Sequence, residues 1–165
     1  IDNGINLSGI SPNKKNIEDG LSTIEEKAIG SSIKSGNSKI EGVLEYGQSP
    51  SIAGLWLMDA PSYTPESLTG FSSAGSQVCL FSTGSGNCYS SDLMPTIRMT
   101  ANPETASRLS HQIDHDCSEL ISNGDFKKAE DKLFEDLVSV LNGKLCYGEI
   151  LGDGGETISR FGEAL

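Results

Sequence analysis

The stretch that decides the fold class is "VCLFSTGSGNCYSSDLMPTIRMTANPE", residues 78–104. It contains two short runs rich in apolar and β-branched residues, 78–81 and 95–101, and the first run ends in a loop of small hydroxyl residues and glycines. Runs of this length predict buried strands. Asn102 as a cap and Pro103 in the first turn then predict the start of a helix. Strands that alternate with helices predict an α/β fold with a mostly parallel sheet.

The segments on either side continue this alternation. A third apolar run, 54–61, predicts another buried strand, and Thr64 with Pro65 predicts a helix that ends at Gly75. The clearest helix is predicted over 125–142, where apolar residues recur with helical spacing opposite Lys, Asp and Glu. Its apolar stripe consists of Phe126, Ala129, Leu133, Phe134, Leu137, Val138 and Leu141.

The two ends of the chain carry weaker signals. Residues 1–20 predict a loop or linker, and 144–165 predict an irregular surface tail. A capping-box pattern at 22–25 predicts a helix that ends at Gly30. A further helix is predicted over about 39–46.

The composition argues against several classes of partner. With 12 basic and 23 acidic residues among 165, the chain has a net charge of −11, which repels phosphate backbones and anionic lipid. No apolar run approaches the roughly 18 residues of a membrane span, and no pattern of a signal peptide is present. We therefore expect a cytoplasmic protein that binds neither nucleic acid nor membrane. The cysteines have no zinc-knuckle spacing and favour a reduced protein, although their number leaves a disulfide open: Cys79, Cys88, Cys117 and Cys146.

The loop after the strand at 78–81 is a candidate ligand cradle. In parallel α/β sheets, ligands bind beyond the carboxyl ends of strands, and small residues there allow the backbone to approach a ligand closely. The loop is not a P-loop, because no Gly-Lys-Ser/Thr follows, and Gly84 and Gly86 alone are a weak dinucleotide signal. Taken alone, such a loop is more often an ordinary turn.

A cluster of possible metal ligands lies at 111–117. His111 and His115 are four residues apart, which would place both imidazoles on one face of a helix. Asp114 and Asp116 add two hard oxygen ligands. The alternative is a solvated loop or helix edge in an acidic protein.

Glu25, Glu26 and Lys27 form a second charged cluster. Two carboxylates and an ammonium group have the chemistry needed for proton transfer. The alternative is an exposed helix turn.

Several separated motifs together resemble the C-terminal region of the altronate/galactarate dehydratase family, which also includes the large subunit of sulfolactate sulfo-lyase. The motifs, in this order, are "LSTIEEKAIG", "LMDAPSYTPESLTGFSSAGSQVCLFSTGSG", "PTIRMTANPE" and "IDHD". The resemblance spans about residues 10–145. It implies a single Rossmann-like α/β domain over 1–165, three-layered and with a mostly parallel sheet, that is the C-terminal fragment of a longer lyase.

The resemblance also implies an activity, a cofactor and partners. Such a lyase eliminates water or sulfite from a small anionic hydroxy acid and uses a divalent metal, with iron expected. The metal would chelate the carboxylate and α-hydroxyl, a base would remove the α-proton and an acid would assist the leaving group. Expected partners are the upstream half of the same protein and further copies in a homo-oligomer, so 1–165 alone is not expected to be active.

Roles carry over to matching positions. The resemblance implies catalytic roles for Glu25, Glu26 and Lys27, with Glu25 or Lys27 as the base. It implies metal or positioning roles for Asp59, Glu66, Asp114 and Asp116, and substrate binding by Ser82, Thr83, Gly84, Gly86 and Asn102.

The chain departs from the family pattern at Ser85, where many members carry an arginine. Loss of that guanidinium removes a bidentate carboxylate ligand. A different substrate or weaker activity would follow. Two alternatives to a dehydratase or sulfo-lyase remain at this point: a non-catalytic domain that binds an organic acid or mediates oligomerisation, and a zinc hydrolase built on His111 and His115.

Overall fold

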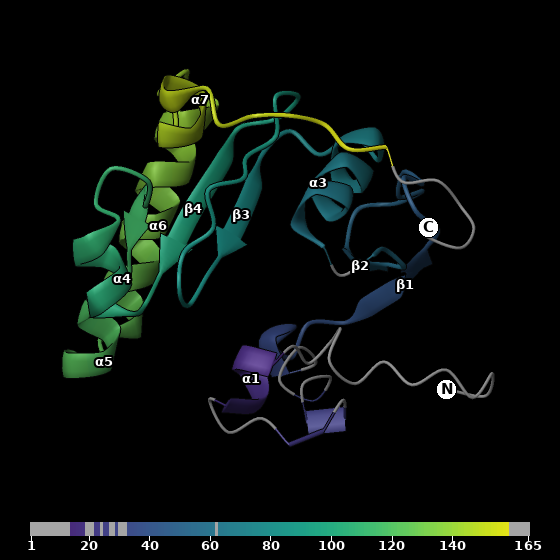
Figure 1. Ribbon diagram of the computed structural model, residues 1–165. Coiled ribbons are helices and arrows are strands. Elements are labelled where there is room, and N and C mark those ends of the chain that lie inside the picture. The colour runs from purple at the N-terminus through teal and green to yellow at the C-terminus, as the bar shows by residue number, and fades with distance from the viewer. Residues whose placement is uncertain are drawn as a thin grey trace. The chain divides into compact units, whose positions relative to one another are not determined.

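The structure is a computed structural model that describes residues 14–18, 22–23, 25–26, 29, 33–61 and 63–158 (Figure 1). The chain divides into two compact units. The first consists of Ile1–Gly42 and Ile52–Leu57, and the second of Val43–Ser51 and Met58–Leu165. Among the described residues, no helix has the length and apolar character needed to cross a membrane.

Strands β1 (Ile40–Leu44) and β2 (Leu55–Met58) form a two-stranded sheet. The prediction of a helix over 39–46 is therefore wrong. The backbone of Gly42 lies so close to the Trp56 ring that a Cβ atom at Gly42 would come within 2.9 Å of a ring carbon. Pairing with β2 and this close packing outweigh the helix propensity of the run, as tertiary contacts often do for short segments.

The second unit contains a parallel sheet with the strand order β3-β4-β5. Its strands are β3 (Cys79–Ser82), β4 (Thr96–Thr100) and β5 (His115–Asp116). The positions of the strands predicted at 78–81 and 95–101 are thus confirmed to within one residue. The predicted burial holds for β4 but is wrong for β3, where Leu80 is 46% exposed. The α/β fold class with a mostly parallel sheet is also confirmed.

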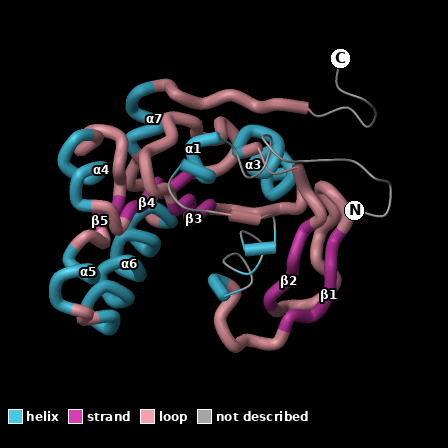
Figure 2. The backbone as a smooth tube through the Cα atoms, turned by 60° about the horizontal axis from the view of Figure 1, so that its bottom comes forward, coloured by secondary structure: helices cyan, strands magenta, loops and turns pink. Residues whose placement is uncertain are grey.

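Helices flank this sheet. Figure 2 shows α4 and α6 on opposite sides of the three strands. The helices of the second unit are α3 (Thr64–Ser73), α4 (Pro103–Arg108), α5 (Glu119–Asn123), α6 (Phe126–Leu141) and α7 (Tyr147–Leu151). Two short helices lie in stretches predicted to be irregular: α7, within 144–165, and α1 (Lys14–Glu18), within 1–20.

Local signals explain where these helices begin. The Asn102 side chain accepts hydrogen bonds from the backbone N–H groups of Glu104 and Thr105, as predicted for a cap. Asp125 caps α6 in the same way through the N–H of Lys128. In α7, the backbone N–H of Cys146 donates to the Glu149 carboxylate over 2.8 Å, although no hydroxyl or acidic residue stands at the cap position.

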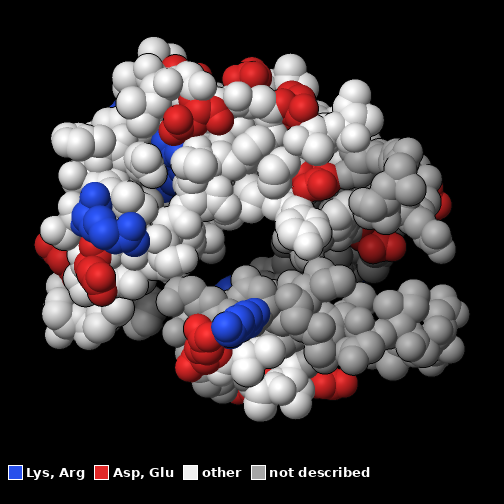
Figure 3. All heavy atoms as spheres, viewed as in Figure 1, with Lys and Arg blue, Asp and Glu red and all other residues white. Residues whose placement is uncertain are grey.

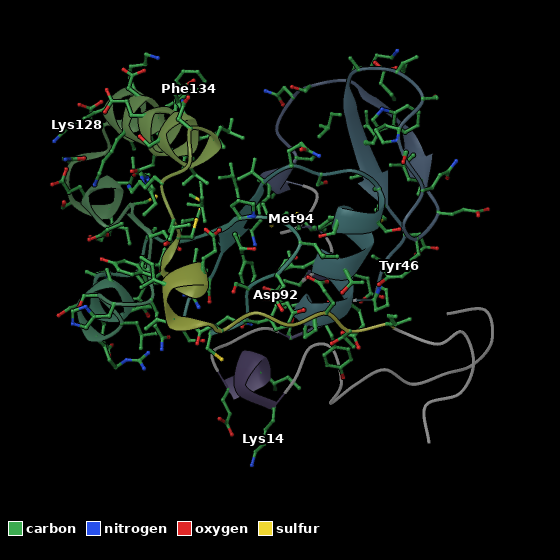
Figure 4. All side chains as sticks on the ribbon, turned by 90° about the horizontal axis from the view of Figure 1, so that it is seen from above. Lys14, Tyr46, Asp92, Met94, Lys128 and Phe134 are labelled. Atoms are coloured by element: carbon green, nitrogen blue, oxygen red, sulfur yellow. The ribbon has the colours of Figure 1, made fainter. Side chains whose placement is uncertain are left out.

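The core of the second unit lies between β4 and α6. Ile97, Val140 and Cys146 are buried together, and Leu137 packs against them. The predicted stripe of α6 is only partly covered, because Phe134, which projects from α6 in Figure 4, is 64% exposed. The strand predicted as buried at 54–61 exists as β2, but its Leu55 and Leu57 are exposed. All four cysteines are free: Cys79, Cys88, Cys117 and Cys146.

Candidate functional site

The loop after β3 is held by α4 and its cap. The carbonyl oxygen of Gly84 accepts hydrogen bonds from Asn102 Nδ2 over 3.1 Å and from Thr105 Oγ1 over 2.7 Å. A guanidinium nitrogen of Arg108 donates to the carbonyl oxygen of Ser85 over 2.9 Å. Two successive loop carbonyls therefore bind side chains from one short segment. Since β3 and β4 are parallel, both carboxyl ends meet at this edge of the sheet.

The loop also closes on itself. The backbone N–H of Gly86 donates to Thr83 Oγ1 over 3.0 Å. Gly86 has a φ of +100°, and a Cβ atom there would overlap the Leu109 side chain. Glycine is thus required at 86 for both conformation and space.

The opposite side of the loop is open. In a trans peptide the N–H points away from the carbonyl of the same unit, so the N–H of Ser85 points away from the groups that hold Gly84. Ser82, Gly84 and Ser85 are exposed. This side presents hydroxyl and amide donors of the kind that bind carboxylates.

Asn102 has a structural task that its predicted substrate role did not include. Its Oδ1 accepts from the first turn of α4, and its Nδ2 donates to Gly84. Both ends of the amide are therefore engaged in fixing the loop. A direct contact between Asn102 and substrate stays a prediction.

The predicted metal ligands Asp114 and Asp116 have partners of their own. Asp114 Oδ2 accepts from the backbone N–H of Arg98 over 2.9 Å, and its Oδ1 accepts from the N–H of Tyr147 over 2.6 Å. Asp116 Oδ1 accepts from the N–H of Ser118 over 2.8 Å. Asp114 thus ties β4 and α7 to the start of β5.

The other two predicted ligands lie before β3. Asp59 follows β2, and its backbone N–H donates to Leu44. Glu66 lies in the first turn of α3, where its backbone carbonyl accepts from the Tyr46 hydroxyl over 2.7 Å. The described part of the chain contains no group of three or more His, Cys, Asp or Glu residues that could hold a metal ion. The described residues by themselves do not fit a metal centre, and the divalent metal stays a prediction.

The two histidines do not share a helix face. His111 lies exposed in a turn, whereas His115 lies on β5 and is 1% exposed. His115 Nδ1 is 2.8 Å from Asp136 Oδ2, and Lys144 binds the other oxygen of Asp136 over 2.9 Å. Burial raises the pKa of Asp136, but the hydrogen bonds from His115 and Lys144 outweigh it and hold the pKa below its usual range. The helical arrangement on which the zinc hydrolase hypothesis depends is therefore wrong.

The predicted catalytic cluster belongs to the first unit. Glu25 and Glu26 are helical and exposed, and Lys27 lies outside the described residues. The Glu26 carboxylate accepts from both the N–H and the hydroxyl of Ser22 over 2.8 Å, and these bonds lower its pKa. The N–H of Glu26 donates to Thr23 Oγ1 over 3.1 Å, so the helix cap lies one residue later than the pattern predicted.

Arg98 is a residue that the sequence interpretation missed. Its side chain is fully buried, and Nη1 donates to the carbonyl oxygen of Cys88 over 2.7 Å and to Asp153 over 3.1 Å. Asp114 lies 3.9 Å from Nε. Arg98 thereby fixes the far end of the loop after β3. A single arginine inside the apolar run "TIRMT" was the available signal.

Comparison with known proteins agrees with the motifs. The family model described as D-galactarate/Altronate dehydratase, C-terminal, matches residues 1–163. The chain is 37% identical over 160 residues to (2R)-sulfolactate sulfo-lyase subunit beta of Chromohalobacter salexigens, covering 96% of the chain and 41% of that protein. It is 32% identical over 139 residues to altronate dehydratase of Escherichia coli, covering 84% of the chain and 28% of that protein. It is 31% identical over 148 residues to galactarate dehydratase (L-threo-forming) of Escherichia coli, covering 87% of the chain and 28% of that protein.

The chain thus spans between 28% and 41% of the length of these relatives. The family model matches nearly all of the chain, including the stretch that spans the four motifs. The chain belongs to the D-galactarate/altronate dehydratase C-terminal family.

Proposed function

We propose that this chain forms part of the catalytic region of a hydro-lyase that removes water from a sugar acid of the altronate or galactarate type. The observation that supports this most is the family match over residues 1–163, together with relatives that are named as altronate and galactarate dehydratases. The loop held by α4 adds an exposed set of donors suited to a carboxylate.

The reaction sets the chemical roles. A base removes the proton from the carbon next to the carboxylate, and the hydroxyl on the following carbon leaves as water after it receives a proton. The resulting enol then becomes a 2-keto-3-deoxy acid. Negative charge develops on the substrate carboxylate in the first step, so hydrogen-bond donors placed there lower the barrier.

Glu25 or Lys27 is the proposed base, and the donors of 82–86 are the proposed cradle. Glu26 is a weaker candidate, because Ser22 already occupies its carboxylate and lowers its pKa. A base with a lowered pKa accepts a proton less readily.

The second candidate is elimination of sulfite from sulfolactate. The 37% identity to a sulfo-lyase subunit over 160 residues favours it. The first step is the same proton removal, but the C–S bond then breaks and sulfite takes the electron pair. The two candidate reactions differ only in the leaving group, which is a hydroxyl in one and a sulfonate in the other, and the site must accommodate whichever of them is present.

One experiment separates these functions. The protein that carries this chain is purified without oxygen, loaded with iron, and incubated separately with altronate, galactarate and sulfolactate. Keto acid without sulfite, from altronate or galactarate, supports the dehydratase, and sulfite from sulfolactate supports the second candidate. Binding of an acid without any product indicates the non-catalytic domain and contradicts both lyase proposals.

Two variants test the base. Lys27→Met and Glu25→Gln are compared with Lys128→Met, which removes a cation from α6. We expect loss of kcat in whichever of the first two removes the base and unchanged kcat in the control. Equal kcat values in all three variants would show that neither Lys27 nor Glu25 is the base.

We also propose that the protein uses a divalent metal, that it forms a homo-oligomer, and that an upstream half of the same protein completes the catalytic region. Dialysis against a chelator should abolish turnover if a divalent metal takes part, and added iron should restore it. Turnover that survives metal removal would show the metal prediction to be wrong. Sedimentation of the whole protein measures its oligomeric state.

A further inference from the structure

Arg108 is placed differently from most of the described cations. It is the last residue of α4, its side chain is exposed, and one guanidinium nitrogen lies 2.9 Å from the carbonyl oxygen of Ser85. A carbonyl oxygen is neutral, so this bond leaves the positive charge uncompensated. The guanidinium has five N–H donors, of which this bond uses one.

Most of the other cations whose side chains the structure describes have a carboxylate close by. In a chain with 23 acidic and 12 basic residues, Figure 3 shows basic side chains against acidic ones on the face drawn. Among the described residues, Lys132 also donates to a backbone carbonyl, that of Asp116, without a carboxylate oxygen within 4.0 Å. Arg98 lies near two carboxylates, and Lys127 and Lys144 each bind at least one. Within the described part of the chain, no carboxylate oxygen lies within 4.0 Å of the Arg108 guanidinium.

We propose that Arg108 binds the carboxylate of the anionic substrate at the loop after β3, with the exposed hydroxyl of Ser85 completing the subsite. A guanidinium presents two parallel N–H donors that match the two oxygens of a carboxylate. In a chain with a net charge of −11, an anion needs such a local positive charge to approach. This proposal rests on the proposed function and names the substrate anchor of that site.

The site is held in shape by other residues. Gly84 is fixed by Asn102 and Thr105, whose side chains carry no charge. Arg108 therefore need not supply the whole attachment of the loop to α4. Among the described residues, the Arg108 guanidinium has the Ser85 carbonyl oxygen as its one hydrogen-bond partner, so its other donors can bind a ligand without releasing the loop.

The simple alternative is that Arg108 only clamps the loop. Thr105→Val weakens the same attachment and leaves the guanidinium in place, so it is the matched comparison. Arg108→Gln removes the charge, and Arg108→Lys keeps the charge but loses the two-pronged geometry. Lys128→Gln removes an exposed cation of α6 that binds Glu119, and it serves as the charge control (Figure 4).

The experiment uses the whole protein and measures kcat and KM with altronate, galactarate and sulfolactate. Binding of each acid is also measured by calorimetry. We expect Arg108→Gln to raise KM and the dissociation constant by about 10-fold to 100-fold with little change in kcat. Arg108→Lys should recover part of the loss. Lys128→Gln should leave both constants unchanged.

The outcomes separate this proposal from the proposed function. If the protein turns over a substrate and Arg108→Gln raises KM no more than Thr105→Val does, the role of Arg108 is overturned and the proposed function stands. Binding that depends on Arg108 without any turnover would overturn only the lyase function. If the unmodified protein binds none of the three acids, both proposals fail.

Discussion

The hydroxyl of Thr105 donates to the carbonyl oxygen of Gly84 over 2.7 Å, and Thr105 is 1% exposed. This buried bond joins the loop after β3 to the helix after β4. Both segments begin at the carboxyl edge of neighbouring parallel strands. The shape of the candidate site therefore depends on one hydroxyl that the sequence motifs did not single out.

Replacement of Thr105 with valine tests this bond. Valine has the same shape but no hydroxyl, so Gly84 keeps only the hydrogen bond from Asn102. We expect the free energy of unfolding to fall by about 1 kcal/mol. Thr105→Ser, which keeps the hydroxyl, should lose less. Urea unfolding followed by circular dichroism measures both, and equal losses for the two variants would show that the hydroxyl contributes nothing.

Gly86→Ala tests the strained turn of the same loop. The φ of +100° at Gly86 disfavours any residue with a Cβ atom, at a cost of about 1–2 kcal/mol, and Leu109 must also move. Gly84→Ala is the control, because a Cβ at Gly84 meets nothing within 4 Å and its φ is not positive. We expect thermal unfolding at a lower temperature for the first variant only. A similar shift in both would contradict the assigned strain.

Arg98→Met tests the buried guanidinium. Its loss leaves Asp153 and the carbonyl oxygen of Cys88 without their buried donor. Breaking a buried ion pair from one side costs about 3 kcal/mol or more. Asp153→Asn should cost less, because an asparagine oxygen can still accept the hydrogen bond from Nη1 and Asp114 still lies 3.9 Å from Nε. The midpoints of urea unfolding compare the two variants, and a fully stable Arg98→Met protein would refute this role.

The hydrogen bonds of Glu156 predict that the free energy of unfolding depends on pH. Its carboxylate accepts from Ser91, from Thr69 over 2.8 Å and from the backbone N–H of Asp92, which lies beside the C-terminal segment (Figure 4). Burial raises the pKa of Glu156, but these hydrogen bonds outweigh it, and the net pKa lies below the ordinary value of 4.5. The ionised form is therefore the one that the folded state favours.

The sign of the effect follows from that direction. A carboxylate whose pKa is lowered on folding stabilises the protein above its unfolded pKa, and the contribution is lost as the pH falls through the folded pKa. Glu156→Gln should thus reduce stability at neutral pH, and its difference from the unmodified protein should shrink below about pH 4.5. Urea unfolding at both pH values measures this, with the exposed Glu135→Gln as control. A difference that is constant with pH would contradict the assignment.

Much of the second unit could be predicted from local patterns. The apolar runs around Leu80 and Ile97 identified two strands, although only β4 is buried on both faces and Leu80 of β3 is 46% exposed. Asn102 marked the start of α4 correctly, since its side chain satisfies backbone N–H groups that lie only two or three residues away. Such contacts are local and need no tertiary information.

The errors arose where distant contacts decide. The run around Gly42 became a strand because β2 pairs with it and Trp56 packs on it. The spacing of His111 and His115 allowed a shared helix face, but His115 lies on β5 and its partner, Asp136, is on α6. Sequence spacing could not show either pairing.

By itself, the sequence determined the α/β class, the places of β3, β4, α3, α4 and α6, and the family, because these depend on local periodicity and on motifs that can be read in order. It did not reveal β5, α5 or α7. Only the tertiary structure decided how the candidate site is held. Thr105 binds the carbonyl of Gly84, and Arg108 binds that of Ser85, each from more than twenty positions along the chain. Arg98 binds Asp153, which lies 55 positions later in the sequence. The physical reason is that a parallel sheet brings the ends of separate strands together, and backbone carbonyls left unpaired there must find donors from whichever helix lies beside them.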